Sequence, residues 1–479
     1  MSGARLVENA LAAAAAAEEA VADASPAERA GWLGAVADAL DAAAGELIPL
    51  AGEETHLAEG RLRGELTRTT FQLRFLAGVA AGGDQLRATV DRADPDWPMG
   101  PRPDIRRVHV PLGATLVFAA SNFPFAFGVP GGDTAAALAA GCPVVVKAHE
   151  GHPRLSDALG RVTAEALAGA GAPAGVFAVV HGREEGVAAL KDPRVRAAAF
   201  TGSQAGGRAL FDIAAARPEP IPFYGELGSI NPVYALPAAV AARGAELAAG
   251  YAASFSGSAG QLCTKPGLLF LPAGHGLGEP LRAAVAELPG GHRLLTEPIA
   301  RGFAAGLDER AHVDGVRVLA TTGPGTPEAP GATLLETGAA TFRAHRELLE
   351  AECFGPLSVV VTYDGEDDLL DLAGTVQPSL TATVHADPAD DALAARLLRT
   401  AARRAGRLVM GGWPTGVTVS AAQQHGGPYP ASTAPATTSV GAAAIDRFLR
   451  PVAWQSVPEH LLPEPLRTAN PWGVRQRTG

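Results

Sequence analysis

Cysteine is scarce in this sequence, which has only Cys142, Cys263 and Cys353 among 479 residues. A small, odd number argues against a disulfide framework and favours a reducing compartment, so we expect a cytoplasmic protein. No cluster of cysteine and histidine has the spacing of metal ligands, and we predict no metal site. Each cysteine must therefore be interpreted singly, as a small core residue or as a nucleophile.

Dense basic runs and long apolar runs are missing as well. The net charge is −11 and no stretch concentrates lysine and arginine, so we predict no nucleic-acid partner. No stretch is long and apolar enough to cross a bilayer, and we predict no membrane partner. The alanine run of residues 10–17 lacks a basic leader and continues into Glu18 and Glu19, which favours a helix over a signal peptide.

The chain has enough apolar residues for more than one core. Hydrophobic residues make up 47% and charged residues 19% of the sequence, as in globular proteins, and a length of 479 residues predicts two or three domains. The alanine-rich sequence of residues 4–23 predicts a helix. A second helix is expected after Ser25, with Pro26 at its first position and Glu28 completing a capping box.

A third helix is predicted over residues 55–80. Its apolar stripe consists of Leu62, Leu66 and Leu73. Another face carries polar residues at helical spacing, namely Arg61, Glu65, Arg68 and Gln72. Glu65 lies one turn before Arg68, and a surface ion pair between these two is one interpretation of that face.

Apolar strands alternate with helices in the next part of the chain. The expected strands are 114–121, 142–148, 176–182, 197–203 and 220–228, and the expected helices are 133–141, 154–170, 184–191 and 204–216. This alternation predicts an α/β fold with a parallel, doubly wound sheet covered on both faces. Residues 229–436 repeat a less regular α/β pattern, residues 94–104 break regular structure, and the tail after 437 is expected to be extended.

Four short segments carry residues that suit one chemistry. They are SAGQLCTKPG with Cys263, ASNFPF with Asn122, YGELGSINP with Glu226, and ECFGP with Glu352. The cysteine lies in a turn rich in glycine, serine and threonine, where a thiolate can sit beside backbone N–H donors with room for a small carbonyl. Asn122 follows an apolar strand, and the carboxyl ends of parallel strands are where such sheets bind ligands.

These segments, together with FTGSQAGG and VVVKAHE, resemble the aldehyde dehydrogenase superfamily over essentially the whole chain. The longer strings RGELTRTTFQLR, MGGWPTGVTVS and HGGPYPAST resemble a narrower branch. That branch contains α-ketoglutaric semialdehyde (2,5-dioxovalerate) dehydrogenases and an NADP-preferring aldehyde dehydrogenase of luminous bacteria. The resemblance implies NAD(P)-dependent oxidation of an aldehyde to a carboxylic acid through a thiohemiacetal and a thioester on Cys263.

The resemblance also implies catalytic roles. Asn122 and the backbone N–H of Cys263 would stabilise the oxyanion. Glu226 would activate the water that hydrolyses the thioester, and burial after an apolar strand could raise its pKa toward working pH. Lys147 is counted with the catalytic residues as well as with those of the cofactor. Cys142 and Cys353 are expected to be core residues.

For the cofactor, the resemblance implies a variant Rossmann mode with NAD or NADP. The residues assigned to it are Lys147, Glu150, Gly202, Ser203, Gly207, Leu227, Glu352 and Phe354. A carboxylate at Glu150 accepts hydrogen bonds from ribose hydroxyls and repels a 2′-phosphate, which favours NAD. His149, His152 and Arg154 are close in sequence and could offset that repulsion, so use of both cofactors stays open.

For the substrate, the favoured aldehyde is α-ketoglutaric semialdehyde, which yields 2-oxoglutarate. Its distal carboxylate requires a guanidinium fork, and Arg68 is the first candidate. Gln72, Phe125 and Gln261 are further candidates for the substrate tunnel, and His425 either contacts substrate or only shapes its loop. A medium- or long-chain fatty aldehyde is the alternative substrate, and a non-catalytic homologue and a CoA-acylating enzyme are remoter alternatives.

The resemblance implies the aldehyde dehydrogenase architecture. An NAD(P)-binding domain would comprise residues 1–92 and 112–228, and a catalytic domain residues 229–436. A bridging arm would comprise residues 93–111 and 437–479. Such arms pair with the sheet edge of a neighbouring subunit, which predicts a homodimer or a homotetramer.

Overall fold

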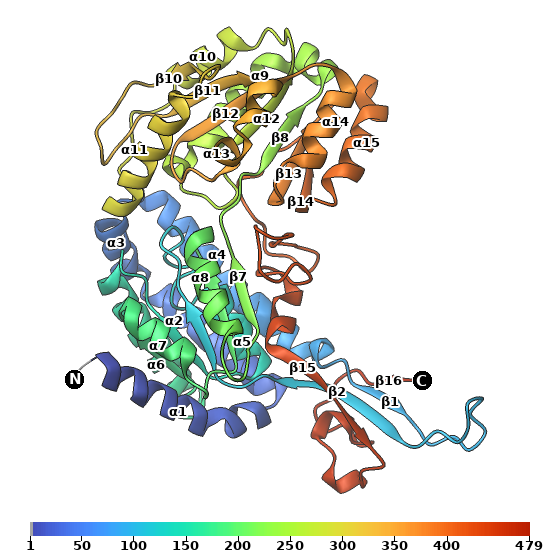
Figure 1. Ribbon diagram of the computed structural model, residues 1–479. Helices are drawn as coiled ribbons and strands as arrows, with labels where there is room; N and C mark the ends of the chain where they lie inside the picture. The colour runs from blue at the N-terminus through green and yellow to red at the C-terminus, as the bar shows by residue number, and fades with distance from the viewer. Residues whose placement is uncertain (1–2) are drawn as a thin grey trace.

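The structure is a computed structural model that describes residues 3–479. Within this range the strands form three sheets, and Figure 1 shows two of them in the upper and lower parts of the molecule. The third lies in an arm that extends away from both parts. No helix within residues 3–479 combines the length and the apolar character that a membrane span requires.

The lower part is built on a five-stranded parallel sheet with the order β5-β4-β3-β6-β7. Its strands are β3 (Thr115–Phe118), β4 (Val144–Lys147), β5 (Phe177–Val180), β6 (Ala197–Thr201) and β7 (Phe223–Glu226). Successive side chains of a strand point to opposite faces, so Val117 joins one hydrophobic core while Leu116 and Phe118 join the other. The doubly wound α/β arrangement predicted from the sequence is confirmed.

Helices cover both faces of this sheet. They are α1 (Gly3–Asp23), α2 (Pro26–Ala42), α3 (Ala44–Thr55), α4 (Glu59–Gly82), α5 (Gly132–Ala140), α6 (Pro153–Gly169), α7 (Arg183–Lys191) and α8 (Gln204–Ala215). The core on one face is formed with α2, α4, α5 and α6, and the core on the other with α7, α8 and the first half of α1. Both sheet faces are thereby removed from water.

The N-terminal helices agree with the sequence in type and differ in one boundary. The capping box is present, because Ser25 Oγ accepts from the Glu28 N–H at 3.2 Å and Glu28 Oε2 accepts from the Ser25 N–H at 2.7 Å. The helix expected from residue 55 begins at Glu59, because His56 takes a left-handed conformation (φ 58°) that ends α3. The α3 helix was not predicted.

The upper part is built on a seven-stranded sheet with the order β10-β11-β12-β9-β8-β13-β14. Its strands are β8 (Pro232–Ala235), β9 (Leu268–Pro272), β10 (Arg317–Thr321), β11 (Thr333–Gly338), β12 (Leu357–Tyr363), β13 (Ser379–His385) and β14 (Ala405–Met410). Its helices are α9 (Pro237–Ser256), α10 (Gly278–Ala286), α11 (Glu297–Ala311), α12 (Ala339–Ala344), α13 (Arg346–Glu350), α14 (Gly365–Thr375) and α15 (Asp391–Ala401). Only the edge strand β10 is antiparallel to its neighbour among the described strands of this sheet.

The arm contains a four-stranded sheet with the order β15-β2-β1-β16. Its strands are β1 (Thr89–Asp91), β2 (Ile105–Pro111), β15 (Leu449–Gln455) and β16 (Arg477–Thr478). The domain predicted over residues 1–92 includes β1. In the structure β1 instead pairs with β2 and β16 and so belongs to the sheet of the arm. The short 3-10 turns are η1 (Asp84–Leu86), η2 (Gly257–Gly260), η3 (Pro388–Asp390), η4 (Ala442–Phe448), η5 (Glu459–Leu461) and η6 (Glu464–Leu466).

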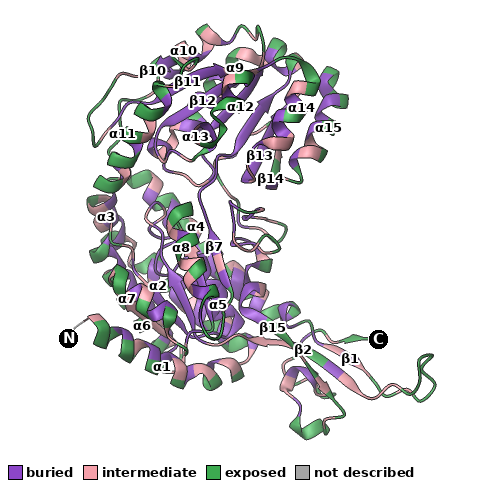
Figure 2. Ribbon diagram, viewed as in Figure 1, coloured by how far each residue is buried: buried purple, intermediate pink, exposed green. Residues whose placement is uncertain are grey.

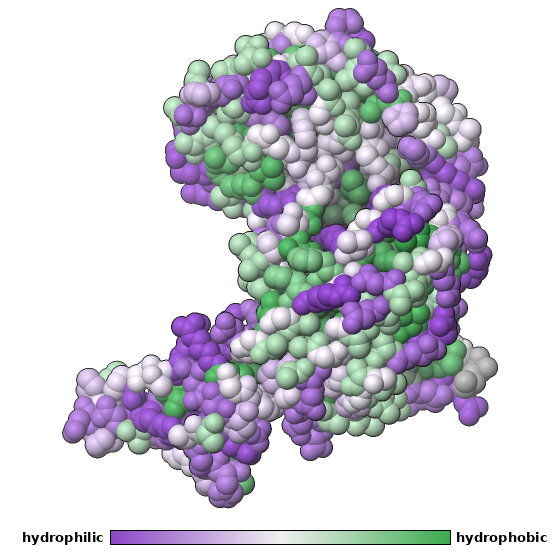
Figure 3. Space-filling model, turned by 180° about the vertical axis from the view of Figure 1, so that it is seen from behind, coloured by the Kyte–Doolittle hydropathy of each residue, from purple (hydrophilic) through white to green (hydrophobic). Residues whose placement is uncertain are grey.

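The tail after residue 437 is not extended throughout. Ile445 and Phe448 of η4 are fully buried in the core that also contains α5, so this part of the tail belongs to the lower part of the molecule. Figure 2 shows that the central strands of the two large sheets are buried, while the outward faces of the helices and much of the arm are exposed or half-buried. The surface is hollowed where the upper and lower parts meet (Figure 3).

Candidate active site

Cys263 lies in a tight turn that follows η2. Ser258, Ala259 and Gly260 all have positive φ, at 52°, 54° and 65°, and a Cβ on Gly260 would lie 2.1 Å from the Gly355 carbonyl oxygen. Glycine is required there because the backbone of the ECFGP segment is in contact. Asn231 Nδ2 donates to the Cys263 carbonyl at 2.8 Å and thereby holds the end of the turn.

Asn122 is brought against the same turn. It follows β3 at the carboxyl end of the five-stranded sheet, is buried, and donates from Nδ2 to the Gln261 carbonyl at 3.0 Å. An amide nitrogen carries two hydrogens, so one N–H is left for another acceptor. The two sequence-predicted residues therefore lie next to each other, although 141 positions separate them in the chain.

Glu65 positions the Asn122 turn, and its role was missed in the sequence. Its Oε1 accepts from the backbone N–H groups of Phe125 and Ala126 at 2.8 and 3.0 Å, and its Oε2 pairs with Arg61 at 3.1 Å. Arg61 also donates to the Asn122 carbonyl at 2.7 Å. The sequence contained a signal, since Arg61 and Glu65 are four residues apart on one helix face.

Glu226 ends β7 in a buried position. Burial raises its pKa well above the ordinary range; the Asp133 charge adds to this effect, whereas Arg447 and a hydrogen bond with Ser432 oppose it. Its Oε2 is buried and has no hydrogen-bond partner. A buried carboxyl group with a raised pKa and a free oxygen is suited to proton transfer.

The Cys263 side chain contacts a histidine. Sγ lies 3.6 Å from His425 Nε2, and His425 itself is almost fully buried. Burial raises the pKa of the thiol to about 12, assisted by Glu226 and Glu352 and opposed by Arg68 and Arg407. Burial also lowers the pKa of His425 to about 3, assisted by nearby arginines. At neutral pH the pair is therefore a thiol and an uncharged imidazole.

The residues assigned to the cofactor gather at the carboxyl ends of β4, β6 and β7. Lys147 ends β4 and its Nζ lies 3.5 Å from Glu150 Oε1. Gly202 follows β6 and donates its N–H to the Glu226 carbonyl at 3.1 Å. Ser203 caps α8 by accepting from the Gly206 N–H at 3.2 Å. An open helix N-terminus next to a lysine and a carboxylate fits a dinucleotide.

Gly207 and Leu227 act through packing. A Cβ on Gly207 would lie 2.1 Å from Leu227 Cδ2, so glycine lets the first turn of α8 approach β7. Leu227 is buried and donates its N–H to the Ala431 carbonyl at 2.8 Å, so its side chain and its N–H are used within the protein. A contact of Leu227 with the cofactor stays a prediction.

Glu352 and Phe354 lie in the segment before β12 of the seven-stranded sheet. A Cβ on Gly228 would lie 2.3 Å from Glu352 Oε2, so this carboxyl group lies directly against the backbone that follows Glu226. Burial raises the pKa of Glu352 to about 7, against the lowering effects of Lys265 and the Ser229 N–H. Phe354 is half-buried two residues further on.

Lys265 is a second residue that the sequence did not single out. It is buried, and its Nζ donates to the carbonyls of Cys353, Gly355 and Leu357 at 2.7, 3.2 and 2.9 Å. Burial lowers its pKa. Lys265 therefore fastens the Cys263 turn to the segment that carries Glu352.

Arg68 and Gln72 face the site from α4. Arg68 does not pair with Glu65, since Glu65 is occupied by Arg61, and the ion pair considered from the sequence is wrong. Arg68 Nη1 is buried without a partner, and its Nε donates weakly to the Val417 carbonyl at 3.4 Å. Both polar atoms of Gln72, one turn further on, are also buried and unpartnered.

Two of the predicted tunnel residues are occupied elsewhere. Phe125 is fully buried in the core of the five-stranded sheet. The Gln261 side chain accepts from the Leu295 N–H at 2.9 Å and donates to the Ser258 carbonyl, so it supports the turn rather than facing the hollow. Phe127 rather than Phe125 lies near these residues, because its ring centroid is 5.5 Å from the Arg68 guanidinium and 6.2 Å from that of the His425 ring.

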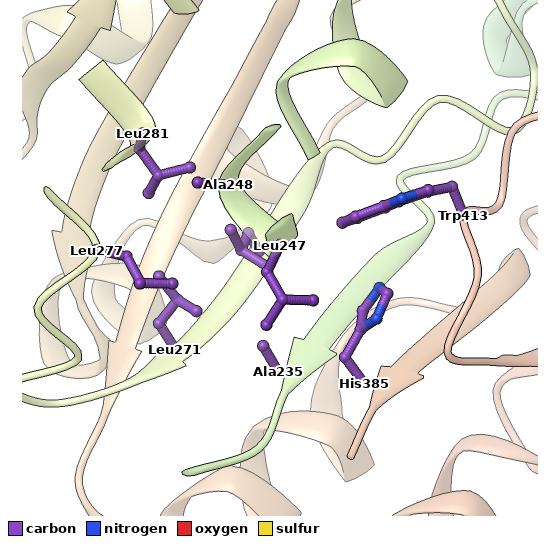
Figure 4. A pocket seen from close by; sticks show the side chains of 9 residues that line it. Ala235, Leu247, Ala248, Leu271, Leu277, Leu281, His385 and Trp413 are labelled. Atoms are coloured by element: carbon purple, nitrogen blue, oxygen red, sulfur yellow. The ribbon is translucent and has the colours of Figure 1, made fainter. Parts of the chain in front are cut away.

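The other two cysteines and a small cavity lie among apolar side chains. Cys142 and Cys353 are buried in cores, as expected. No group of three or more metal-ligating side chains is found in residues 3–479. A small cavity in the upper part is lined mainly by Leu and Ala residues together with His385 and Trp413 (Figure 4), and Cys263 is not among its lining residues.

Comparison with known proteins agrees with this arrangement. The pattern of the family described as "Aldehyde dehydrogenase family" matches residues 1–429. "Alpha-ketoglutaric semialdehyde dehydrogenase 2" of Azospirillum brasilense is 46% identical over 460 residues, 95% of this chain and 87% of that protein. "Alpha-ketoglutaric semialdehyde dehydrogenase" of Acinetobacter baylyi is 39% identical over 455 residues, 93% of this chain and 85% of that protein.

A solved structure shares the fold. Aldehyde dehydrogenase 21 from Physcomitrella patens, determined with the reaction product succinate, superimposes with a TM-score of 0.78 at 20% identity, covering 94% of this chain and 89% of that one. At this identity the likeness concerns the fold, and the family follows from the matches in sequence. The chain belongs to the aldehyde dehydrogenase family and is an NAD(P)-dependent oxidoreductase that acts on an aldehyde.

Proposed function

We propose that this enzyme oxidises α-ketoglutaric semialdehyde to 2-oxoglutarate. The observation that carries the proposal is Arg68, a partly buried guanidinium beside the Cys263 thiol with an unpartnered Nη1 and no acidic partner. A cation left unpaired in a partly dry site favours an anionic ligand, and the distal carboxylate of this aldehyde is such a ligand. The names of the relatives at 46% and 39% identity support the same substrate.

Attack on the aldehyde would begin at Cys263. The thiol is the resting form, so its proton must leave as the sulfur–carbon bond forms. The uncharged imidazole of His425, with Nε2 3.6 Å from Sγ, would orient the thiol by accepting its hydrogen bond, while its low pKa makes it too weak a base to keep that proton. The second N–H of the Asn122 amide and the backbone N–H of Cys263 would then stabilise the oxyanion of the thiohemiacetal.

The cofactor would lie across the ends of β4, β6 and β7. Lys147 and Glu150 would hold the adenine ribose, the start of α8 at Ser203 the phosphates, and Glu352 the second ribose. When bound, NAD(P) supplies the acceptor for the hydride that leaves the thiohemiacetal. Phe354 would pack beside this end of the cofactor.

Hydrolysis of the thioester would use Glu226. In its ionised form it removes a proton from water, and its free Oε2 is available for this contact. Because burial raises its pKa, the ionised fraction grows as pH rises through that raised value. Deacylation should therefore accelerate with pH.

We propose NAD as the preferred cofactor. Glu150 is exposed and only loosely paired with Lys147, so its carboxylate is free to accept from both ribose hydroxyls. The three residues that could offset its repulsion of a 2′-phosphate are not available. Burial lowers the pKa of His149 to about 3, His152 bonds to the Ala120 carbonyl and Ser156, and Arg154 pairs with Glu53 at 2.7 Å.

The alternatives are weaker on the same observations. A long-chain fatty aldehyde would leave Arg68 buried without a counter-charge. A non-catalytic homologue would have no use for Cys263, Asn122 and Glu226 assembled at one hollow, and a CoA-acylating enzyme would have no use for the base Glu226.

We also propose that residues 93–111 and most of the tail form an arm that assembles homodimers or homotetramers.

The test is reduction of NAD and NADP, followed at 340 nm (a standard absorbance band of the reduced cofactors). We expect kcat/KM for α-ketoglutaric semialdehyde to exceed that for a long unbranched aldehyde at least tenfold, about 1.4 kcal/mol of discrimination. Succinic semialdehyde should be intermediate, since it keeps the carboxylate at a different distance. Equal kcat/KM values for the three aldehydes would overturn the substrate assignment.

A further inference from the structure

Two arginines near Cys263 lack an acidic partner. Both Arg68 and Arg407 lower the pKa of the Cys263 thiol through their charge, which places both within electrostatic range of it. Glu65, one turn before Arg68 on α4, is already paired with Arg61. No ion pair of Arg68 or Arg407 is found in residues 3–479. The carboxyl groups of Glu226 and Glu352 also act on Cys263, but neither is paired with these two arginines.

Arg407 reaches this region from the opposite part of the molecule. It lies on β14, directly after Gly406, where a Cβ would lie 2.0 Å from the Gly426 carbonyl oxygen. The backbone of β14 therefore runs against the loop that carries His425. Among the charges that lower the pKa of His425, Arg407 has the largest effect, ahead of Arg68.

Both guanidinium groups bind one short segment, residues 414–417. Arg407 donates from Nη1 to the Gly416 carbonyl at 2.9 Å and from Nη2 to the Pro414 carbonyl. Arg68 donates from Nε to the Val417 carbonyl at 3.4 Å. Residues 414–417 thus accept hydrogen bonds from both arginines and link the two guanidinium groups through one strip of backbone.

This segment is itself held in place by α9. The Thr415 hydroxyl lies 3.1 Å from that of Ser254, and a Cβ on Gly250 would lie 2.4 Å from the Trp413 ring. Since the loop is fixed at both contacts, the positions of the two guanidinium groups are fixed with it.

Each guanidinium keeps a buried donor that is not used. Arg407 Nε and Arg68 Nη1 are shielded from water and have no hydrogen-bond partner. A buried donor on a cation that lacks an acceptor is costly, so these two N–H groups favour a ligand that supplies acceptors. A carboxylate with an adjacent ketone offers three acceptor oxygens on neighbouring carbons, and the unused buried donors of two guanidinium groups can share them.

We propose that Arg407 is a second substrate-binding residue, which receives the 2-oxo-carboxylate end of the aldehyde together with Arg68. This role presupposes the substrate proposed above. It makes specificity depend on both parts of the molecule, because α4 supplies one arginine and β14 the other. A neutral aldehyde of the same length gains nothing from Arg407.

The test compares α-ketoglutaric semialdehyde with pentanal, a neutral five-carbon aldehyde, in the full-length enzyme. For Arg407→Met we expect KM for the keto-semialdehyde to rise at least tenfold while kcat/KM for pentanal stays within twofold. Arg407→Lys keeps the charge without the fork and should recover only part of the loss. The matched control is Arg404→Met, since Arg404 precedes β14 and donates to the Gly374 carbonyl, away from the site.

A binding measurement distinguishes a failure of the role inferred for Arg407 from a failure of the proposed substrate. Titration calorimetry with 2-oxoglutarate and with pentanoate should show at least tenfold weaker binding of 2-oxoglutarate to Arg407→Met than to the wild type, with pentanoate less affected. Equal losses for pentanal and the keto-semialdehyde would mean that Arg407 only holds the loop, and would overturn the inference. A wild-type enzyme without preference for the keto-semialdehyde would overturn the proposed function instead, and the calorimetric comparison would still decide the role of Arg407.

Discussion

At the scale of single residues, the site is governed by burial. Cys263, Glu226 and Glu352 all have raised pKa values because their charged forms are poorly solvated, and burial lowers the pKa of His425. The arginines are the cations that oppose this shift at Cys263. The resting site therefore holds a thiol and an uncharged imidazole, and charge develops on the sulfur and the oxyanion only during the reaction.

The first prediction concerns Glu226→Gln. If Glu226 is the base for thioester hydrolysis, acylation remains possible and deacylation slows by about 10²- to 10⁴-fold. Rapid mixing should then show one equivalent of reduced cofactor per active site in a first burst, followed by slow turnover. Loss of the burst together with turnover would place Glu226 in the acylation step. Glu219→Gln, an exposed glutamate before β7, is the control.

The second prediction concerns cofactor choice. Replacing Glu150 by serine removes the carboxylate that repels a 2′-phosphate and leaves Lys147 nearby without its 3.5 Å partner. We expect the ratio of kcat/KM with NAD to that with NADP to fall at least tenfold, about 1.4 kcal/mol. An unchanged ratio would mean that Glu150 does not meet the ribose. Glu53→Ser, which frees Arg154 instead, tests whether that arginine matters.

At the scale of elements, the five-stranded sheet was predictable and the contacts between elements were not. Each strand and helix from residue 114 to 228 was found within a few residues, because apolar runs and helical periodicity are local signals. The contact between Cys263 and His425 joins residues 162 positions apart, and no local pattern encodes it. Phe125 was misplaced because the direction of a side chain in a tight turn depends on the turn, which Glu65 sets.

The structure also gives a packing role to the tryptophan of the motif MGGWPTGVTVS. Trp413 lies against α9 at Gly250 and is tilted against His385 of β13, with ring centroids 4.5 Å apart. Figure 4 shows these two rings beside the cavity, whose lining includes Leu271, Leu277 and Leu281. Both nitrogens of His385 are buried without partners, and the cavity of about 10 Å³ has room for about one water molecule.

The third prediction follows from His385. Burial lowers its pKa to about 4 from an ordinary 6.5. Below pH 6.5 the unfolded chain gains a proton at this position while the native protein does not, so its contribution to stability falls as pH drops toward 4. At pH 5 the loss is about 2 kcal/mol. His385→Leu should therefore lose less thermal stability between pH 7 and pH 5 than the wild type. Equal losses would contradict this, and exposed His312→Leu is the control.

At the scale of the whole molecule, neither large part contains a complete site. Asn122 and Glu226 come from the five-stranded sheet, whereas Cys263 and Glu352 come from segments next to the seven-stranded sheet. Arg68 likewise comes from the lower part and Arg407 from the upper part. The Asn122 amide binds the Cys263 turn through the Gln261 carbonyl, and Lys265 binds that turn to the segment of Glu352. We therefore expect catalysis to depend on how firmly the two parts are held, and the proposed assembly of subunits would then affect activity directly.

The last prediction concerns that assembly. β14 is an edge of the seven-stranded sheet and exposes Leu408 and Met410 at 38% and 52%, and the arm exposes Met99 at 93%. Edge strands with apolar side chains invite pairing with another chain, so we expect β14 to be covered by a neighbouring subunit.

Met410→Glu should therefore reduce the mass measured by light scattering from a multiple of 48.7 kDa toward a single chain. Val318→Glu is the matched control, because Val318 is 52% exposed on β10 at the other edge of the same sheet. A wild type that is already monomeric would exclude the arm as an assembly device, and dissociation by Val318→Glu alone would move the interface to β10. If Met410→Glu dissociates the enzyme, its kcat should fall with its mass, since the hollow between the two parts would lose the support of the neighbouring subunit.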